Sequence, residues 1–176
     1  MRVTEYCRTI PDYPIEGINF YDLNSVFSSN FFSKMIRLLK RRIDEEYIKD
    51  PTHIVGVESR GFVVGSALAH EMGLPFTMVR KASAKYPGNV KQESYDLEYG
   101  SNNIVLQEGI LGHTSRVIIV DDLIATGGTL LATERLCKAF GAKVLANVAL
   151  LDLEYIVTPE KKELNNIIVL ESVKHG

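Results

Sequence analysis

Hydrophobic positions in the first half of the chain alternate between helical and strand-like spacing. Residues 31–47 place their apolar side chains on one side of a helix, because those positions recur at the period of a helical turn. The apolar run at residues 53–57 predicts a buried strand, and residues 76–80 predict another. Residues 61–72 predict a helix that ends at Gly73, since glycine readily adopts the left-handed conformation found after a helix.

The second half of the chain repeats this alternation. Residues 117–120 predict a central strand, residues 128–140 a helix that ends at Gly141, and residues 143–151 and 167–170 two further strands. Shorter strands are expected near residues 95–99 and 103–107. Strands that alternate with helices favour an α/β fold, with a mostly parallel, twisted sheet flanked by helices.

Residues 81–94 interrupt the pattern with a long stretch that carries no helical or strand-like period. In a compact domain such a stretch is usually a functional lid or a disordered segment. We therefore expect a flexible lid loop and a ribbon at about residues 81–100.

Composition limits the partners of the chain. Its 20 basic and 22 acidic residues give a formal net charge of -2, which offers no general attraction to nucleic acid or to an anionic membrane. No stretch approaches the ~20 apolar residues of a membrane span. Cys7 and Cys137 show no metal-ligand spacing and cannot form a disulfide framework, so we expect a cytoplasmic protein. A length of 176 residues without internal repeats predicts one domain, residues 1–176.

Residues 117–129 join a strand, two carboxylates, a glycine turn and the start of a helix. In open α/β sheets, ligands bind at this end of the strand. Backbone N–H groups at a helix N-terminus favour a phosphate, and the loop that would present them consists of Ala125, Thr126, Gly127, Gly128 and Thr129.

The two carboxylates before this loop, Asp121 and Asp122, would repel a phosphate. They are suited to accept hydrogen bonds from a sugar diol and to hold Mg²⁺, directly or through water. The segment therefore predicts a site for a ribose 5-phosphate.

Other interpretations of these motifs are less consistent with the sequence. A helix cap and an ordinary turn would explain two acids and two glycines, but not the whole pattern of residues 117–129. The glycine spacing at residues 56–61 is that of a P-loop, yet Phe62 stands where the lysine would be required. A response-regulator receiver would need its acidic residues nearer the start of the domain.

Residues 117–129 resemble the signature of the type I phosphoribosyltransferases, which bind phosphoribosyl pyrophosphate. The similarity continues through residues 11–17, 58–62, 80–81 and 95–100, where the chain resembles the adenine phosphoribosyltransferases. The resemblance implies transfer of the phosphoribosyl group to adenine, with AMP and pyrophosphate as products and Mg²⁺ as cofactor. It also implies a homodimer, and a small N-terminal hood over the base at about residues 1–30.

The resemblance assigns a pyrophosphate loop to Glu58, Ser59 and Arg60, with a non-proline cis peptide at the junction of Ser59 with Glu58 or Arg60. The loop follows a predicted strand, so Arg60 can face the acid pair, and its guanidinium suits a diphosphate. The alternative is a surface Arg60 paired with Glu58. Lys81 and Lys85 would add charge for the departing pyrophosphate. The lid at residues 80–87 is one residue longer than in relatives and lacks their glycine.

The resemblance also places base recognition and proton control. Glu98 would act as a catalytic residue with Arg60, by controlling the protonation of the base at N7. Tyr99 would close over the phosphoribosyl group, beside the pyrophosphate. The residues that would contact the base are Phe20 and Leu123 on its two faces, and the backbones of Asn19 and Tyr21 at its edge.

Asn19 and Tyr21 depart from the residues common in relatives, so another purine base, namely hypoxanthine, guanine or xanthine, remains an alternative substrate. A second alternative is a non-catalytic sensor of phosphoribosyl pyrophosphate that controls a nucleic acid or protein partner. Such a sensor would need a DNA-binding domain or a basic stripe, for which this chain has no room. We therefore expect no nucleic acid partner.

Overall fold

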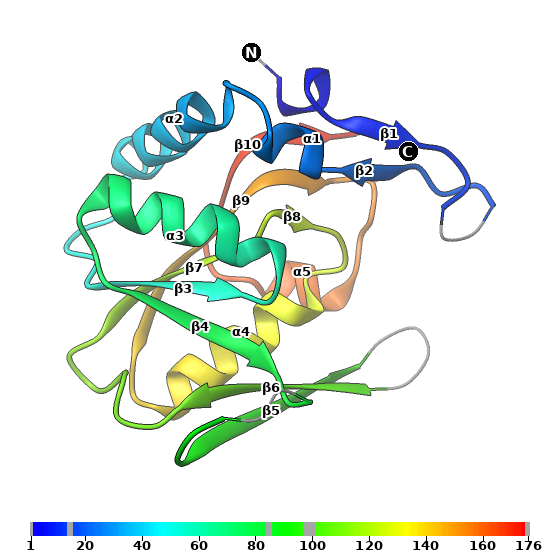
Figure 1. Cartoon of the computed structure of the whole chain (residues 1–176). Coiled ribbons are helices and arrows are strands. Elements are labelled where there is room, and N and C mark those ends of the chain that lie inside the picture. The colour runs from blue at the N-terminus through cyan, green and yellow to red at the C-terminus, as the bar shows by residue number, and fades with distance from the viewer. Residues whose placement is uncertain (1, 14–15, 84–85, 97–100, 175–176) are drawn as a thin grey trace.

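The computed structural model describes residues 2–13, 16–83, 86–96 and 101–174. In this part of the chain, parallel strands form the centre of one sheet in the order β10-β9-β7-β3-β4 (Figure 1). Their bounds are His53–Val57 for β3, Phe76–Lys81 for β4, Arg116–Val120 for β7, Lys143–Leu153 for β9 and Ile167–Val173 for β10. The predicted α/β fold with a mostly parallel sheet is confirmed.

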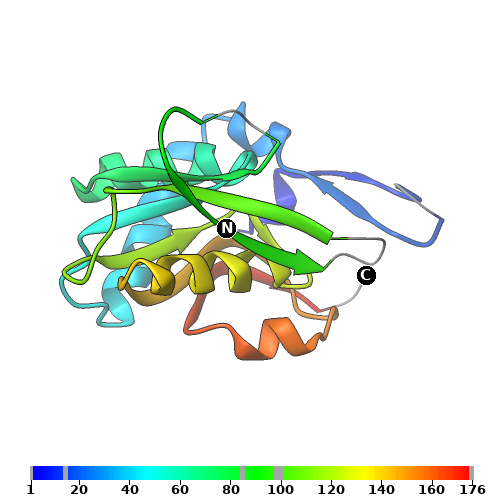
Figure 2. The same ribbon diagram turned by 90° about the horizontal axis from the view of Figure 1, so that it is seen from below.

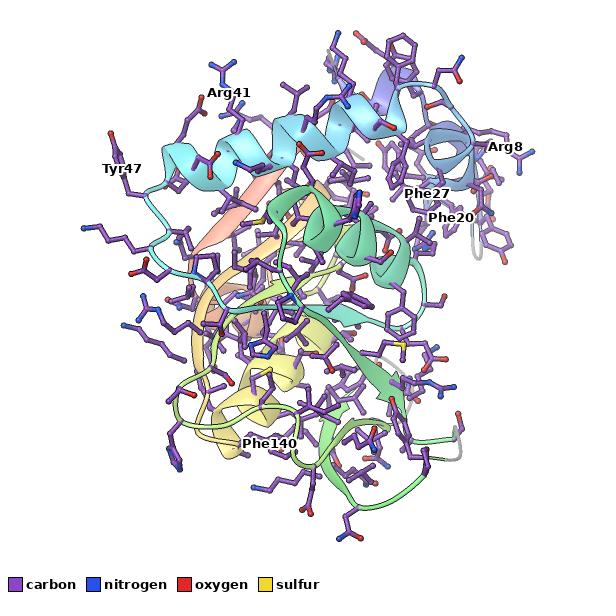
Figure 3. All side chains as sticks on the ribbon, turned by 60° about the vertical axis from the view of Figure 1, so that its left-hand side comes forward. Arg8, Phe20, Phe27, Arg41, Tyr47 and Phe140 are labelled. Carbon is purple, nitrogen blue, oxygen red and sulfur yellow. The ribbon has the colours of Figure 1, made fainter. Side chains whose placement is uncertain are left out.

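Helices cover both faces of this sheet, as Figures 1 and 2 show. Helices α2 (Phe32–Glu45) and α3 (Arg60–Met72) pack on one face, and α4 (Gly128–Ala139) packs on the other. The predicted helices agree closely with these bounds, and α3 ends as expected at Gly73, whose φ is 66°. In Figure 3, Arg41 points outward from α2, consistent with the polar face of this helix. Tyr47, expected on the apolar side, instead lies beyond the end of α2 and is exposed.

One edge of the sheet continues past β4 as an antiparallel ribbon of β6 (Ser101–Gln107) and β5 (Val90–Asp96). The expectation that residues 81–94 lack structure is therefore wrong from Val90 onward. Pairing with β6 and contact with α4 stabilise this polar strand. Neither interaction can be inferred from the residues of the strand alone. Lys91 makes the contact with the end of α4: its Nζ donates to Ala139 O at 2.7 Å and lies 4.6 Å from the centroid of the Phe140 ring.

Several short elements were not predicted. The N-terminal segment forms η1 (Val3–Glu5), a separate hairpin of β1 (Arg8–Ile10) and β2 (Phe20–Asp22), and α1 (Asn24–Phe27). Later in the chain are β8 (Leu123–Ile124), which pairs with β9, and α5 (Pro159–Glu163). Such elements are too short to carry a hydrophobic period, so only tertiary contacts specify them.

The carboxyl ends of the parallel strands β3, β4 and β7 lie on the same side of the sheet. The β1–β2 hairpin and the β5–β6 ribbon both extend toward this side (Figure 1). The hairpin occupies the part of the chain where the hood is expected. Among the described residues, no helix has the length and apolar character needed to cross a membrane.

Candidate active site

Arg60 and Asp122 meet where two neighbouring strands end. Strands β3 and β7 pair in parallel, with Gly56 beside Val120, so the residues that follow each strand emerge side by side. Arg60 Nε lies 2.9 Å from Asp122 Oδ2, and the Asp122 side chain is only 5% exposed. The structure thus brings together the arginine and the acid pair that the sequence places after separate strands.

Gly61 allows α3 to begin against the end of β7. A Cβ atom at this position would lie 2.8 Å from Val120 O and 2.9 Å from Asp121 Oδ1. Both distances are too short for a Cβ contact, and neither neighbour can easily move. Val120 O belongs to the backbone, and Asp121 Oδ1 is held by the hydrogen bond from the Asp122 N–H. Any larger residue would displace the first turn of α3 and carry Arg60 away from Asp122.

The acid pair is electrostatically strained. Burial raises the pKa of Asp121 well above its ordinary value, and the neighbouring Asp122 charge raises it further. Burial also raises the pKa of Asp122, although Arg60 opposes this increase. The Asp122 N–H donates to Asp121 Oδ1 at 2.8 Å, which fixes one carboxylate against the next peptide. Such a pair favours the approach of a cation or of hydroxyl donors.

The predicted phosphate loop connects β8 to α4 and surrounds a small hollow. The hollow has a volume of about 100 Å³ and is lined by Asp121, Leu123, Ile124, Ala125, Thr126, Gly127, Thr129 and Leu130. Gly127 has a φ of 83°, a left-handed conformation that suits glycine, and it immediately precedes α4. Within the described residues, the amides of residues 126–130 donate to no acceptor. The loop therefore offers free N–H groups at a helix N-terminus.

The Glu58 loop holds a second group of charges. The Glu58–Ser59 peptide is cis, as expected at this junction. Glu58 Oε2 accepts a hydrogen bond from Lys81 N–H at 2.7 Å and lies 3.7 Å from Arg80 Nε. Glu58 is thus engaged by β4, and the alternative pairing of Arg60 with Glu58 is wrong.

Sequence reasoning did not place Arg80 and Tyr86 among the site residues. The guanidinium carbon of Arg80 lies 5.1 Å from the centroid of the Tyr86 ring, which connects the lid to the Glu58 loop. The Arg80-Lys81 pair at a strand end was a usable signal for Arg80. No sequence signal indicated Tyr86, because its position depends on how the lid folds back.

The hairpin brings Phe20 to the same place. The guanidinium carbon of Arg60 lies 5.7 Å from the centroid of the Phe20 ring. The ring of Tyr13, in the connection between β1 and β2, has its centroid 5.1 Å from that of Phe20. Figure 3 shows Phe20 on the hairpin side, at the opposite end of the molecule from Tyr47. Phe20, Arg60 and Asp122 thus form a continuous row.

Tyr21 points away from this row. Successive side chains in a strand alternate between faces, and Tyr21 lines a hollow of about 540 Å³ together with Arg2, Thr9 and Lys174. Asn19, immediately before this strand, is half-buried, and Leu123 lines the phosphate hollow. The structure therefore gathers Phe20 and Leu123 near the acid pair, whereas the Tyr21 side chain faces elsewhere.

The remaining expected residues divide into two groups. Lys81 lies at the end of β4 with an exposed side chain, near enough to Glu58 to donate its backbone N–H. The lid and ribbon positions Lys85, Glu98 and Tyr99 lie outside the described residues.

Comparison with known proteins agrees with this geometry. Residues 25–170 match the model of the phosphoribosyl transferase domain. An adenine phosphoribosyltransferase of Carboxydothermus hydrogenoformans is 39% identical over 176 residues, covering 99% of this chain and 100% of the relative.

Two crystal structures are also similar. The adenine phosphoribosyltransferase of Saccharomyces cerevisiae, complexed with an imino-altritol bisphosphate and adenine, superposes with a TM-score of 0.89 at 34% identity, covering 96% of both chains. The enzyme of Trypanosoma brucei, in complex with AMP, pyrophosphate and ribose-5-phosphate, gives a TM-score of 0.78 at 26% identity, covering 95% of this chain and 77% of that one. The chain belongs to the phosphoribosyltransferase family, among the adenine phosphoribosyltransferases.

Proposed function

We propose that the chain transfers the phosphoribosyl group of phosphoribosyl pyrophosphate to adenine, giving AMP and pyrophosphate in purine salvage. The observation that carries this proposal is the Arg60–Asp122 pair beside a loop of free amides at one sheet edge. The similar enzymes from yeast and Trypanosoma brucei, which were crystallised with adenine and with AMP, pyrophosphate and ribose-5-phosphate, support the same substrates and products.

Each part of the donor has a matching group. The 5′-phosphate binds the amides and hydroxyls of residues 125–129, where the helix N-terminus supplies partial positive charge. Asp121 and Asp122 accept hydrogen bonds from the ribose hydroxyls. Arg60, Lys81 and Lys85, with the backbone of Glu58 and Ser59, neutralise the pyrophosphate, and Tyr99 closes over it.

In the reaction, the bond between ribose C1′ and pyrophosphate oxygen breaks, and a bond between C1′ and adenine N9 forms. Positive charge develops on the ribose as the leaving group departs, so the nearby carboxylates lower the energy of the transition state. Phe20 and Leu123 hold the base between them, and the backbones of Asn19 and Tyr21 read its edge. Glu98 controls the protonation of N7 as N9 attacks.

We also propose Mg²⁺ as cofactor. Mg²⁺ is usually held by one or two carboxylates together with substrate phosphates, rather than by a cage of protein ligands. The adjacent carboxylates of Asp121 and Asp122 fit that arrangement, and the described residues hold no cluster of three or more acidic, histidine or cysteine ligands. The ion would neutralise the diphosphate, with Asp121 and Asp122 as ligands directly or through water.

We propose two further properties. A homodimer is expected from the family resemblance. A cytoplasmic location is consistent with Cys7 and Cys137, which are not paired with each other and whose pKa burial raises to about 12, so both thiols stay protonated and unreactive.

The test is an assay with Mg²⁺, phosphoribosyl pyrophosphate and one purine base at a time. We expect nucleotide formation with adenine. Faster formation with hypoxanthine, guanine or xanthine would assign another base, which the altered residues at the hood rim, Asn19 and Tyr21, make the main alternative. Binding of phosphoribosyl pyrophosphate without turnover of any base would identify a sensor instead.

A further inference from the structure

The short helix α5 lies directly behind the phosphate loop. The hydroxyl of Thr158, the residue before α5, donates a hydrogen bond to Thr126 O at 2.5 Å. Gly127 packs against α5 so closely that a Cβ atom there would lie 2.9 Å from Lys161 Cα and 3.1 Å from Lys161 N. Figure 1 shows α5 beside β8 and the first turn of α4, and the two helices are in contact.

The Thr158 hydrogen bond determines which way the next amide points. In a trans peptide the C=O and N–H groups point in opposite directions. Because Thr158 holds the Thr126 carbonyl toward α5, the N–H of Gly127 points away from α5. Thr126 and Gly127 both line the hollow of the loop. One hydroxyl outside the loop thereby orients an amide that the 5′-phosphate would use.

Lys161 attaches α5 to the sheet. Its Nζ lies 2.5 Å from Asp152 Oδ1 and donates to Leu153 O at 2.7 Å, and the Lys161 and Asp152 side chains are each only 11% exposed. Asp152 is also the residue of β9 that pairs with Ile124 of β8, immediately before the loop. The loop and the helix behind it are therefore both fixed to the same stretch of β9.

We propose that Thr158 is a positioning residue for the 5′-phosphate, and that Lys161 keeps the helix behind the loop in place for it. This inference rests on the proposed function, because it assumes that the loop binds the 5′-phosphate. Thr158 also accepts the Lys161 N–H at 3.1 Å as the N-cap of α5, so its replacement removes two hydrogen bonds. Ligand selectivity separates loop orientation from a general loss of stability.

The test compares the Thr158→Val and Thr158→Ser variants by titration calorimetry with ribose 5-phosphate and, separately, with pyrophosphate and Mg²⁺. For Thr158→Val we expect the Kd for ribose 5-phosphate to rise about tenfold and the Kd for pyrophosphate to change less than about twofold, as for loss of one oriented donor. Thr158→Ser keeps the hydroxyl and should restore the affinity. If Thr158→Val does not fold, Thr158→Ala removes the same hydroxyl without placing a methyl group against the Thr126 carbonyl.

Thr52→Val is the matched control. The Thr52 hydroxyl also accepts a hydrogen bond from a backbone N–H, that of Arg116 at 2.8 Å, and donates to a carbonyl, Arg116 O at 3.3 Å. Thr52 precedes β3, so it lies at the amino ends of the strands, away from the phosphate loop. It should lower thermal stability without changing either affinity.

Equal losses for both ligands in Thr158→Val, or an unchanged affinity for ribose 5-phosphate, would overturn the inference. The proposed function is judged separately, by turnover of the unsubstituted protein. A chain whose affinity for ribose 5-phosphate depends on Thr158 but which converts no base would support this inference and refute the proposed activity.

Discussion

Arg60 and Asp122 form an ion pair in which one partner is buried and the other is accessible. Their side chains are 37% and 5% exposed, and Nε lies 2.9 Å from Oδ2. Because β3 and β7 are neighbours in the sheet, a residue from each strand end can share this position. Arg60 also lies against Phe20, so the pair connects the hairpin to the acidic end of β7.

Replacement of Asp122 by Asn should lower kcat/KM for phosphoribosyl pyrophosphate about 100-fold, because it removes a charged acceptor of ribose hydroxyls. The amide has the same shape and relieves the burial of a charge, so the thermal unfolding midpoint should not fall greatly. Steady-state kinetics and a thermal melt measure the two effects. Near-normal kinetics would show that Asp122 has no direct part in the reaction.

Replacement of Arg60 by Lys should raise the KM for phosphoribosyl pyrophosphate about tenfold, because lysine keeps the charge but loses the planar set of donors. The matched control is Arg41→Lys, whose side chain points outward from α2 in Figure 3 and bonds Glu45 at 2.9 Å. That control should behave as the unsubstituted protein. A normal KM for Arg60→Lys would mean that charge alone suffices.

Replacement of Phe20 by Leu should raise the KM for adenine about fivefold, because it removes an aromatic surface on which the base stacks. The KM for phosphoribosyl pyrophosphate should change less. Thr9→Ala, on the other strand of the hairpin and facing the Tyr21 hollow, is the control. If only the KM for phosphoribosyl pyrophosphate rises, the role of Phe20 is to support Arg60.

Glu98→Gln should lower kcat about 100-fold with little change in affinity for phosphoribosyl pyrophosphate, because glutamine cannot exchange a proton with the base. Glu93→Gln, in strand β5, provides the control. Calorimetry and single-turnover kinetics separate binding from chemistry. The reverse pattern, with weak binding and normal turnover, would assign Glu98 to substrate binding.

Glu171 should contribute to stability in a pH-dependent way. Burial alone would raise its pKa, but hydrogen bonds from Thr4 and the Arg2 charge outweigh burial and lower the pKa below the ordinary 4.5. Stability from a lowered pKa is present above the ordinary value and is lost as pH falls through the lowered one. Urea unfolding across that range should show a loss for the unsubstituted protein that is smaller in Glu171→Gln. Parallel curves would show that Glu171 does not titrate differently on folding.

Much of the fold could be predicted from sequence because the relevant signals are local. The stripe of α2, the apolar runs of β3 and β7 and the glycine after α3 each lie within one element. Most of strand β5 (Val90–Asp96) could not be predicted, because its polar residues become a strand only through pairing with β6. The strand expected near residues 95–99 overlaps only its last two residues. The hairpin of β1 and β2 is similar, since its three-residue strands carry no period.

The candidate site divides in the same way. The acid pair and the phosphate loop are contiguous in the chain, so residues 121–129 alone predicted two carboxylates beside a loop of backbone amides. The tertiary structure decided what faces them: Arg60 from the start of α3, Phe20 from the hairpin, and Thr158 behind Thr126. It also turned the Tyr21 side chain away. The physical reason is that a local motif determines the backbone conformation of its own residues. Contacts between segments distant in sequence depend instead on the order of the strands and on how the side chains pack against the sheet.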